Sequence, residues 1–272
     1  MFKKIYKKLR KNFQKKKQPK TIFLSQKKIY NHHLIKRSTF DKKLSLKIIT
    51  SHDSNYNNVG KITVETMKNY AKKYNLEFEF LSMPSTGRAQ TWNKIISIKE
   101  QILRKKNDYI MWVDADAFFH KDAENILSVI EDKYEIYLSS HYCGVFKGSN
   151  YKNTVLTVNR INCGVMIFKV TNFCIKFLEK VWNKKNYIDH YWYEQAAIMD
   201  LVGLKVDITG NLKDNAGDDF YLKKIKFLNK EWNSIPSSSE ISTESFRPSI
   251  IHLAGIKNEI RMRFLKNYLN KM

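Results

Sequence analysis

The sequence is poor in the residues that mark several protein classes. Its 272 residues include only nine glycines and four prolines, which argues against collagen-like and low-complexity chains. The three cysteines, Cys143, Cys163 and Cys174, are odd in number and lack the spacing of a zinc motif, so we expect a reducing compartment and no disulfide framework. No apolar run approaches the roughly 18 residues of a membrane-spanning helix. Lysines interrupt the N-terminus, so no signal peptide is expected.

Acidic residues are scarce, above all at one end of the chain. The formal net charge is +23, and residues 1–43 contribute +15 of it because sixteen Lys/Arg face a single acid, Asp41. Apolar residues recur at helical spacing among the lysines of residues 2–13. This pattern predicts either a short basic helix lying on an anionic membrane surface or a solvated tail. Charge alone is unspecific for nucleic acid, and no nucleic-acid partner is expected.

From residue 44 onward, short apolar runs alternate with amphipathic segments. Strands are predicted at 46–50, 76–81 and 109–113, with helices at 59–74 and 91–105 between them. This order predicts an α/β fold in which helices flank a mostly parallel central sheet, within a single domain spanning 44–272. In the second half we expect strands at 134–138, 165–170 and 249–253, a polar loop region at 144–159, and helices at 172–184, 193–201 and 257–271.

Two carboxylates, Asp114 and Asp116, follow the apolar run 109–113 directly. A run this short and apolar is typical of a strand buried on both faces, and open α/β sheets bind ligands at the ends of such strands. Buried aspartates need a compensating partner, and a hard divalent cation that bridges to phosphate is a suitable one. The pair therefore predicts a metal–phosphate site, although two surface turn aspartates would look similar. Phe119 and Asn125 occupy the positions where an EF-hand needs Gly and Glu, which excludes that motif.

Three further segments carry polar groups that suit a sugar or a phosphate, although each is weakly specific alone. A small residue beside an amide permits close approach of the backbone to a ligand. Glu194 and Gln195, a carboxylate and an amide, begin a predicted helix. His252 and Lys257 flank the glycine turn at Gly255 after the last predicted strand. These residues are Asn162 with Gly164, Glu194 with Gln195, and His252 with Gly255 and Lys257.

Together these segments resemble the GT-A fold of sugar-nucleotide glycosyltransferases. More narrowly, the chain resembles the galactosyl/xylosyltransferase family of yeast and plant Golgi enzymes, family 34. The matching blocks occur in the family's order over roughly residues 45–257. They are Ile48-Ile49-Thr50-Ser51, Arg88…Trp92-Asn93-Lys94, Trp112-Val113-Asp114-Ala115-Asp116, Asn162-Cys163-Gly164-Val165, Glu194-Gln195 and His252…Gly255…Lys257.

The resemblance implies retaining transfer from a nucleotide sugar, usually a UDP-sugar. Our hypothesis is that a hexose, above all galactose, moves to a hydroxyl of a surface glycan or glycolipid, and the basic residues 1–43 suggest the lipid-linked acceptor. The implied cofactor is Mn²⁺, or Mg²⁺ in its place. By the same resemblance, the metal ligands are Asp114, Asp116 and His252. The nucleotide-sugar site would contain Thr50, Arg88, Lys94, Asp114, Gly164 and Lys257. Asn162, Glu194 and Gln195 would lie at the reacting centre, with Glu194 as nucleophile or charge stabiliser. We expect a cytoplasmic protein held on the cytoplasmic face of a membrane by residues 1–43.

Two other functions fit parts of the sequence. Another Asp-x-Asp enzyme, a metal-dependent phosphotransferase or nucleotidyltransferase, would use Asp114 and Asp116 and would not need Asn162 or His252. A non-enzymatic binder of membranes or nucleic acid would rest on the basic residues 1–43 alone.

Overall fold

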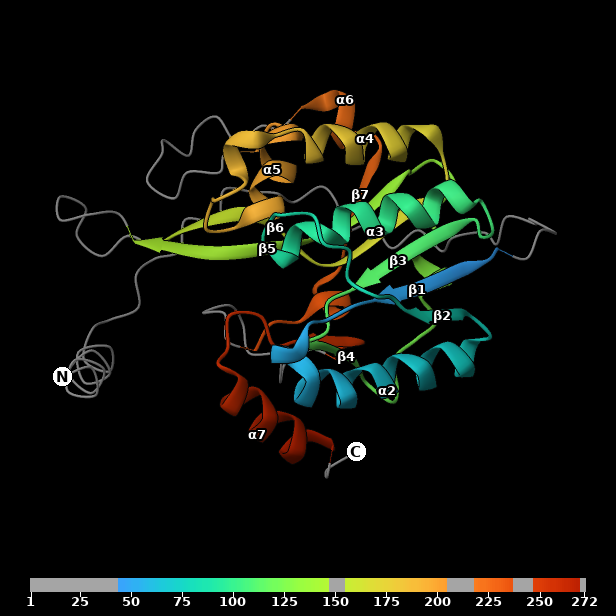
Figure 1. The fold of residues 1–272 in the computed structure, drawn as a ribbon, viewed down its shortest axis with the longest axis vertical. Helices are drawn as coiled ribbons and strands as arrows, with labels where there is room; N and C mark the ends of the chain where they lie inside the picture. The colour runs from blue at the N-terminus through green and yellow to red at the C-terminus, as the bar shows by residue number, and fades with distance from the viewer. Residues whose placement is uncertain (1–43, 147–154, 205–217, 237–246, 270–272) are drawn as a thin grey trace, which may run out of the picture. The chain divides into compact units, whose positions relative to one another are not determined.

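The computed structural model describes residues 44–146, 155–204, 218–236 and 247–269. The predicted basic arm, residues 1–43, lies outside this part of the chain. A six-stranded sheet in the order β2-β1-β3-β6-β5-β7 forms the centre of the described domain (Figure 1). Its strands are β1 (Leu46–Thr50), β2 (Glu77–Phe80), β3 (Tyr109–Val113), β5 (Ile136–Phe146), β6 (Val155–Lys169) and β7 (Ile225–Leu228).

Only one strand of this sheet runs against the others. β1 pairs in parallel with β2 and β3, and β5 pairs in parallel with β7, whereas β6 runs antiparallel to both of its neighbours, β3 and β5. The prediction of a mixed, mostly parallel sheet is thus confirmed. All five residues of β3 are buried, so the apolar run before Asp114 is buried on both faces as its composition indicated.

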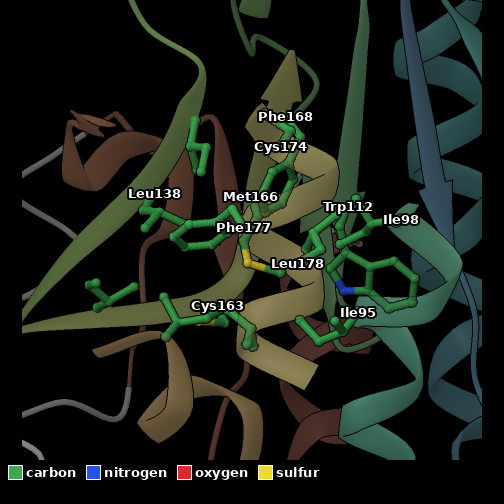
Figure 2. Close-up of a cluster of buried hydrophobic side chains, with 14 of the residues drawn as sticks. Ile95, Ile98, Trp112, Leu138, Cys163, Met166, Phe168, Cys174, Phe177 and Leu178 are labelled. Carbon is green, nitrogen blue, oxygen red and sulfur yellow. The ribbon is translucent and has the colours of Figure 1, made fainter. Parts of the chain in front are cut away.

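Helices cover both faces of the sheet (Figure 1). Helices α3 (Gln90–Arg104), α4 (Asn172–Trp182) and α5 (Tyr193–Leu201) pack on one face. There Ile95 and Ile98 of α3 belong to the same buried cluster as Phe177 and Leu178 of α4 (Figure 2). Helix α2 packs on the other face through Met67, Tyr70 and Ala71. The helix bounds are α2 (Asn57–Tyr74), α3 (Gln90–Arg104), α4 (Asn172–Trp182), α5 (Tyr193–Leu201), α6 (Asp219–Leu222) and α7 (Asn258–Leu269).

A second, two-stranded sheet brings distant parts of the sequence together. β4 (Ala117–Phe119) pairs antiparallel with β8 (Ile250–His252), and the register places Ala117 opposite His252. The 3-10 helix η5 (Lys230–Asn233) precedes Ser234, which bridges to Ile251 of β8. These pairings set the positions of Asp116 and His252 relative to each other.

The predicted loop region at 144–159 is wrong at both ends. β5 continues to Phe146 and β6 begins at Val155, and these two residues pair with each other across the antiparallel ladder. Backbone pairing between the two strands satisfies their N–H and C=O groups whatever the polarity of the side chains. A pattern of side-chain polarity therefore missed these strand ends. Residues 147–154 of the predicted loop lie outside the described residues.

Candidate active site

A cavity of about 270 Å³ opens at the carboxyl ends of β1 and β3. It is the place where parallel strands of an open α/β sheet present ligand-binding residues. Eight of the eleven predicted site residues line it, namely Lys94, Asp114, Asp116, Asn162, Gly164, Glu194, Gln195 and His252. The fold thus gathers segments that lie far apart in the sequence around one space.

Three of the lining residues form a candidate metal site. One ligand atom each from Asp114, Asp116 and His252 lies within 4.8 Å of the others. His252 Nε2 lies 3.2 Å from Asp116 Oδ1 and 3.8 Å from Asp114 Oδ2. Carboxylates suit both Mg²⁺ and Mn²⁺, and an imidazole is a common ligand of first-row divalent metals. The residues therefore fit the divalent cation that the resemblance implies.

Arg261 of α7 holds the second oxygen of Asp116. Its Nη2 lies 2.8 Å from Asp116 Oδ2, and its Nε donates to the carbonyl of Leu253. Burial alone raises the pKa of Asp116, but His252 in its charged form and the Arg261 guanidinium outweigh it and lower the pKa to about 2. Asp116 is therefore ionised at neutral pH. Oδ1 faces His252 while Oδ2 is tied to Arg261.

Lys94 of α3 bridges two further carboxylates of the cavity, those of Asp114 and Glu194. Its Nζ lies 2.8 Å from Asp114 Oδ1 and 3.1 Å from Glu194 Oε1. Trp112 Nε1 also donates to Asp114 Oδ1, at 2.6 Å. One oxygen of Asp114 is thus held by two donors, and the other lies on the side of His252.

The buried charges of this cluster perturb one another. Burial alone lowers the pKa of Lys94, but the carboxylates of Asp114 and Glu194 hold it above its ordinary value. Burial raises the pKa of Glu194; Lys94 opposes this effect, and the Asp114 carboxylate adds to it. Glu194 Oε2 is buried and has no hydrogen-bond partner among the described residues. Such an oxygen lacks the partner that buried polar atoms normally have.

The charged side chains that contact one another in the cavity, a group without the lining residue Asp53, carry more negative than positive charge. Three carboxylates, Asp114, Asp116 and Glu194, meet two side-chain cations, Lys94 and Arg261. When His252 is neutral, as a metal-binding imidazole must be, one negative charge is not compensated within this group. Uncompensated charge at a buried site is costly, and a divalent cation among Asp114, Asp116 and His252 would meet it.

The start of α5, which forms part of the cavity wall, has an unusual backbone. Trp192, Tyr193, Glu194 and Gln195 are consecutive, and all four line the cavity at the start of α5. Tyr193 has a φ of 45°, in the left-handed region that non-glycine residues rarely adopt. Gln195 Oε1 accepts a hydrogen bond from the backbone N–H of Cys163, which ties the start of α5 to β6.

Three predicted site residues do not line the cavity. Thr50 is fully buried at the end of β1, and Lys257 is exposed before α7. The Arg88 guanidinium lies 3.7 Å from the ring centre of Trp182 and donates to the carbonyl of that residue. Arg88 thus packs the start of α3 against the end of α4. The roles of these three residues at a nucleotide sugar stay predictions.

Sequence reasoning missed Arg261 and Tyr56, which both line the cavity. The Arg261 guanidinium lies 5.0 Å from the ring centre of Tyr56. Arg261 belongs to the basic terminal helix that the sequence predicted, but nothing in the local pattern distinguishes it from Arg263 or Lys266. Among the described helices, none combines the length and the apolar character needed to cross a membrane.

No protein-family model matches the sequence, and a comparison with curated proteins finds no match. Among solved structures, the chain is similar to a glycosyltransferase involved in the glycosylation of the major capsid of PBCV-1. The TM-score is 0.56 at 14% identity, over 82% of this chain and 99% of that one. It is also similar to the glycosyltransferase GlyE of Streptococcus pneumoniae TIGR4, with a TM-score of 0.50 at 10% identity, over 84% of this chain and 64% of that one. The chain therefore has the GT-A fold of these glycosyltransferases.

Proposed function

We propose that the protein is a metal-dependent, retaining glycosyltransferase. It would move a hexose, galactose in our prediction, from a UDP-sugar to a hydroxyl of a surface glycan or glycolipid. The observation that carries the proposal is the group Asp114, Asp116 and His252 in a cavity at the strand ends of a GT-A fold. The predicted Asn162, Glu194 and Gln195 line the same cavity, which favours a sugar over a bare phosphate ester.

The residues of the cavity would have different roles in such a reaction. Asp114, Asp116 and His252 would hold the cation, which when bound acts as a Lewis acid toward the departing diphosphate. Arg261 keeps Asp116 ionised and fixes its orientation. Lys94 holds Asp114 and Glu194 in place, so that neither carboxylate is free to turn toward the other.

Glu194 is the carboxylate that we assign to the sugar. Its Oε1 is tied to Lys94, while its buried Oε2 has no hydrogen-bond partner among the described residues. In the oxocarbenium-like transition state expected by analogy with glycoside hydrolysis, a carboxylate at this place would stabilise the developing positive charge. A direct covalent role for Glu194 and front-side attack by the acceptor are both compatible with this placement.

A thermal-shift panel tests the proposed function with the full chain. UDP-galactose with Mn²⁺ is expected to raise the melting temperature, because a ligand at 100 times its Kd stabilises by about 2.7 kcal/mol. EDTA should remove the shift, and a GDP-sugar should produce a smaller one. The double variant Asp114→Ala/Asp116→Ala serves as control and should show no Mn²⁺-dependent shift. An equal shift in this variant, or a shift with nucleotides that is indifferent to the sugar, would count against a glycosyltransferase and favour the rival classes.

We also propose that the basic residues 1–43 hold the enzyme at an anionic membrane surface on the cytoplasmic side. The composition of this segment is what supports the proposal, since each Lys or Arg near such a surface contributes about 1 kcal/mol. A chain that begins at residue 44 is expected to lose its co-sedimentation with phosphatidylserine liposomes at moderate salt. Unchanged co-sedimentation of the shortened chain would show that the arm is a solvated tail.

A further inference from the structure

Asn233 of η5 connects two residues of the cavity, although it lies outside every sequence motif. Its Oδ1 lies 2.9 Å from Nδ1 of His252, and its Nδ2 donates to Oδ1 of Asn162 at 2.8 Å. The same oxygen of Asn162 accepts the backbone N–H of Gly164 at 2.9 Å. Asn233 and His252 are both buried. A continuous chain of hydrogen bonds therefore runs from the backbone of β6 to the imidazole of His252.

The directions of the three hydrogen bonds follow from the backbone N–H of Gly164, the donor at which the chain begins. The backbone N–H of Gly164 can only donate, so the Asn162 atom that faces it must be the oxygen. The Asn233 atom that contacts this oxygen must then be the amide nitrogen, which leaves Oδ1 of Asn233 facing His252. Because that oxygen can only accept, Nδ1 of His252 carries the proton. The relay thus assigns the Nδ1–H form to a neutral His252.

This proton position leaves Nε2 of His252 with its lone pair toward the carboxylates. Nε2 lies 3.2 Å from Oδ1 of Asp116. Two acceptors at this separation repel each other unless a cation or a proton lies between them. The relay therefore presents Nε2 as a ligand, in the arrangement by which outer residues orient metal-binding histidines.

The backbone around Asn233 is fixed to the same strand as His252. Ser234 N donates to the carbonyl of Ile250, and His252 N donates to the carbonyl of Ser234 at 2.7 Å. Asn233 is thus anchored one residue before a bridge to β8. Because the backbone beside Asn233 is held in place, its side-chain amide stays fixed relative to His252 and favours one tautomer of the imidazole.

We propose that Asn233 is a positioning residue of the metal site, which fixes the Nδ1–H tautomer of His252 through the relay from Gly164 and Asn162. The proposal deepens the proposed function, on which its metal-binding part rests. The tautomer itself is a property of the metal-free protein and can be measured independently.

The test compares Asn233→Ala with the wild-type chain by two measurements. In metal-free protein, at a pH high enough to keep His252 neutral, ¹⁵N-histidine NMR is expected to show the Nδ1–H form in the wild type and a mixture of tautomers in the variant. Without nucleotide, Mn²⁺ binding followed by electron paramagnetic resonance is expected to weaken about 10- to 100-fold, the usual effect of losing such an outer partner. An unchanged tautomer together with unchanged Mn²⁺ affinity overturns the proposal.

Two further variants separate positioning from general destabilisation. Asn107→Ala removes an equally buried amide, which donates to Glu77 Oε1 at the amino ends of β2 and β3, away from the cavity. It should leave both measurements unchanged. Asn233→Asp keeps an acceptor for His252 and should retain the tautomer. If the wild type has the tautomer but does not bind Mn²⁺, the metal-binding part fails together with the proposed function, and the tautomer assignment stands.

Discussion

Replacing Gly164 with alanine is expected to abolish Mn²⁺ binding by the metal-free protein. A Cβ added at Gly164 would lie 2.0 Å from Cε1 and 2.4 Å from Nδ1 of the His252 ring. The ring cannot retreat easily, because it is buried and its Nδ1 is bound to Asn233. Either His252 leaves the site or β6 and β8 move apart, and both outcomes separate the predicted ligands.

The size of this effect can be bounded. Overpacking of a buried site costs typically about 1–3 kcal/mol of stability. Loss of an outer partner of a metal ligand lowers affinity about 10- to 100-fold, so displacement of a ligand should lower it by at least about 100-fold. Isothermal titration with Mn²⁺ measures the affinity, and urea unfolding measures the stability.

Gly60→Ala is the matched control for the glycine substitution. A Cβ at Gly60 would also meet an imidazole, at 2.3 Å from Cδ2 of His52, but His52 is not a member of the metal group. This variant should bind Mn²⁺ as the wild type does, whatever its stability. Wild-type Mn²⁺ affinity in Gly164→Ala would remove His252 from the ligand set.

The sequence predicts those parts of the site that are marked by a pattern of neighbouring residues. A buried five-residue strand must end in a turn, and the polar residues that follow it, Asp114 and Asp116, are then placed at the sheet edge. His252 could be connected with them only through the resemblance to a family, because their proximity depends on the pairing of β4 with β8. Periodicity of side chains does not reveal which short strands pair.

Arg261 and Asn233 could not be predicted for the same physical reason. Arg261 belongs to α7, whose position is set by the packing of Leu265 in a buried cluster. Asn233 belongs to η5, whose position is set by the packing of Trp232 in another. An arginine in a basic helix and an asparagine in a polar turn have ordinary local explanations. Only the distances to Asp116 and His252 distinguish them from other residues of their kind.

Lys94→Met is expected to cost about 3–5 kcal/mol of unfolding free energy at neutral pH, the usual effect of removing one partner from a buried ion pair. The substitution keeps the aliphatic length of the side chain and removes its charge. Glu194, whose side chain is 5% exposed, and Asp114 then lose their common cation. Lys99→Met on the same helix is the matched control, because its pair with Glu179 is partly exposed and should contribute less than about 1 kcal/mol.

The pH dependence of this loss identifies the unpaired group. The pKa of Glu194 is already raised in the folded protein, and removing Lys94 removes the main effect that lowers it. A carboxyl group whose folded pKa lies above its unfolded pKa destabilises the fold when ionised, and this penalty disappears as the pH falls through the folded pKa. The difference between wild type and Lys94→Met should therefore shrink on acidification, measured by urea unfolding across a pH series.

A second substitution assigns the loss to Glu194 itself. Lys94→Met/Glu194→Gln replaces the charged pair with two neutral side chains of similar size, so no carboxylate at position 194 is left buried without its cation. Because partners in contact are not additive, the double variant should be more stable than Lys94→Met alone. Equal instability of the two variants would locate the cost at Asp114 or in packing. The main stabilising contact of Lys94 would then be its ion pair with Asp114, the predicted metal ligand, and not its ion pair with Glu194.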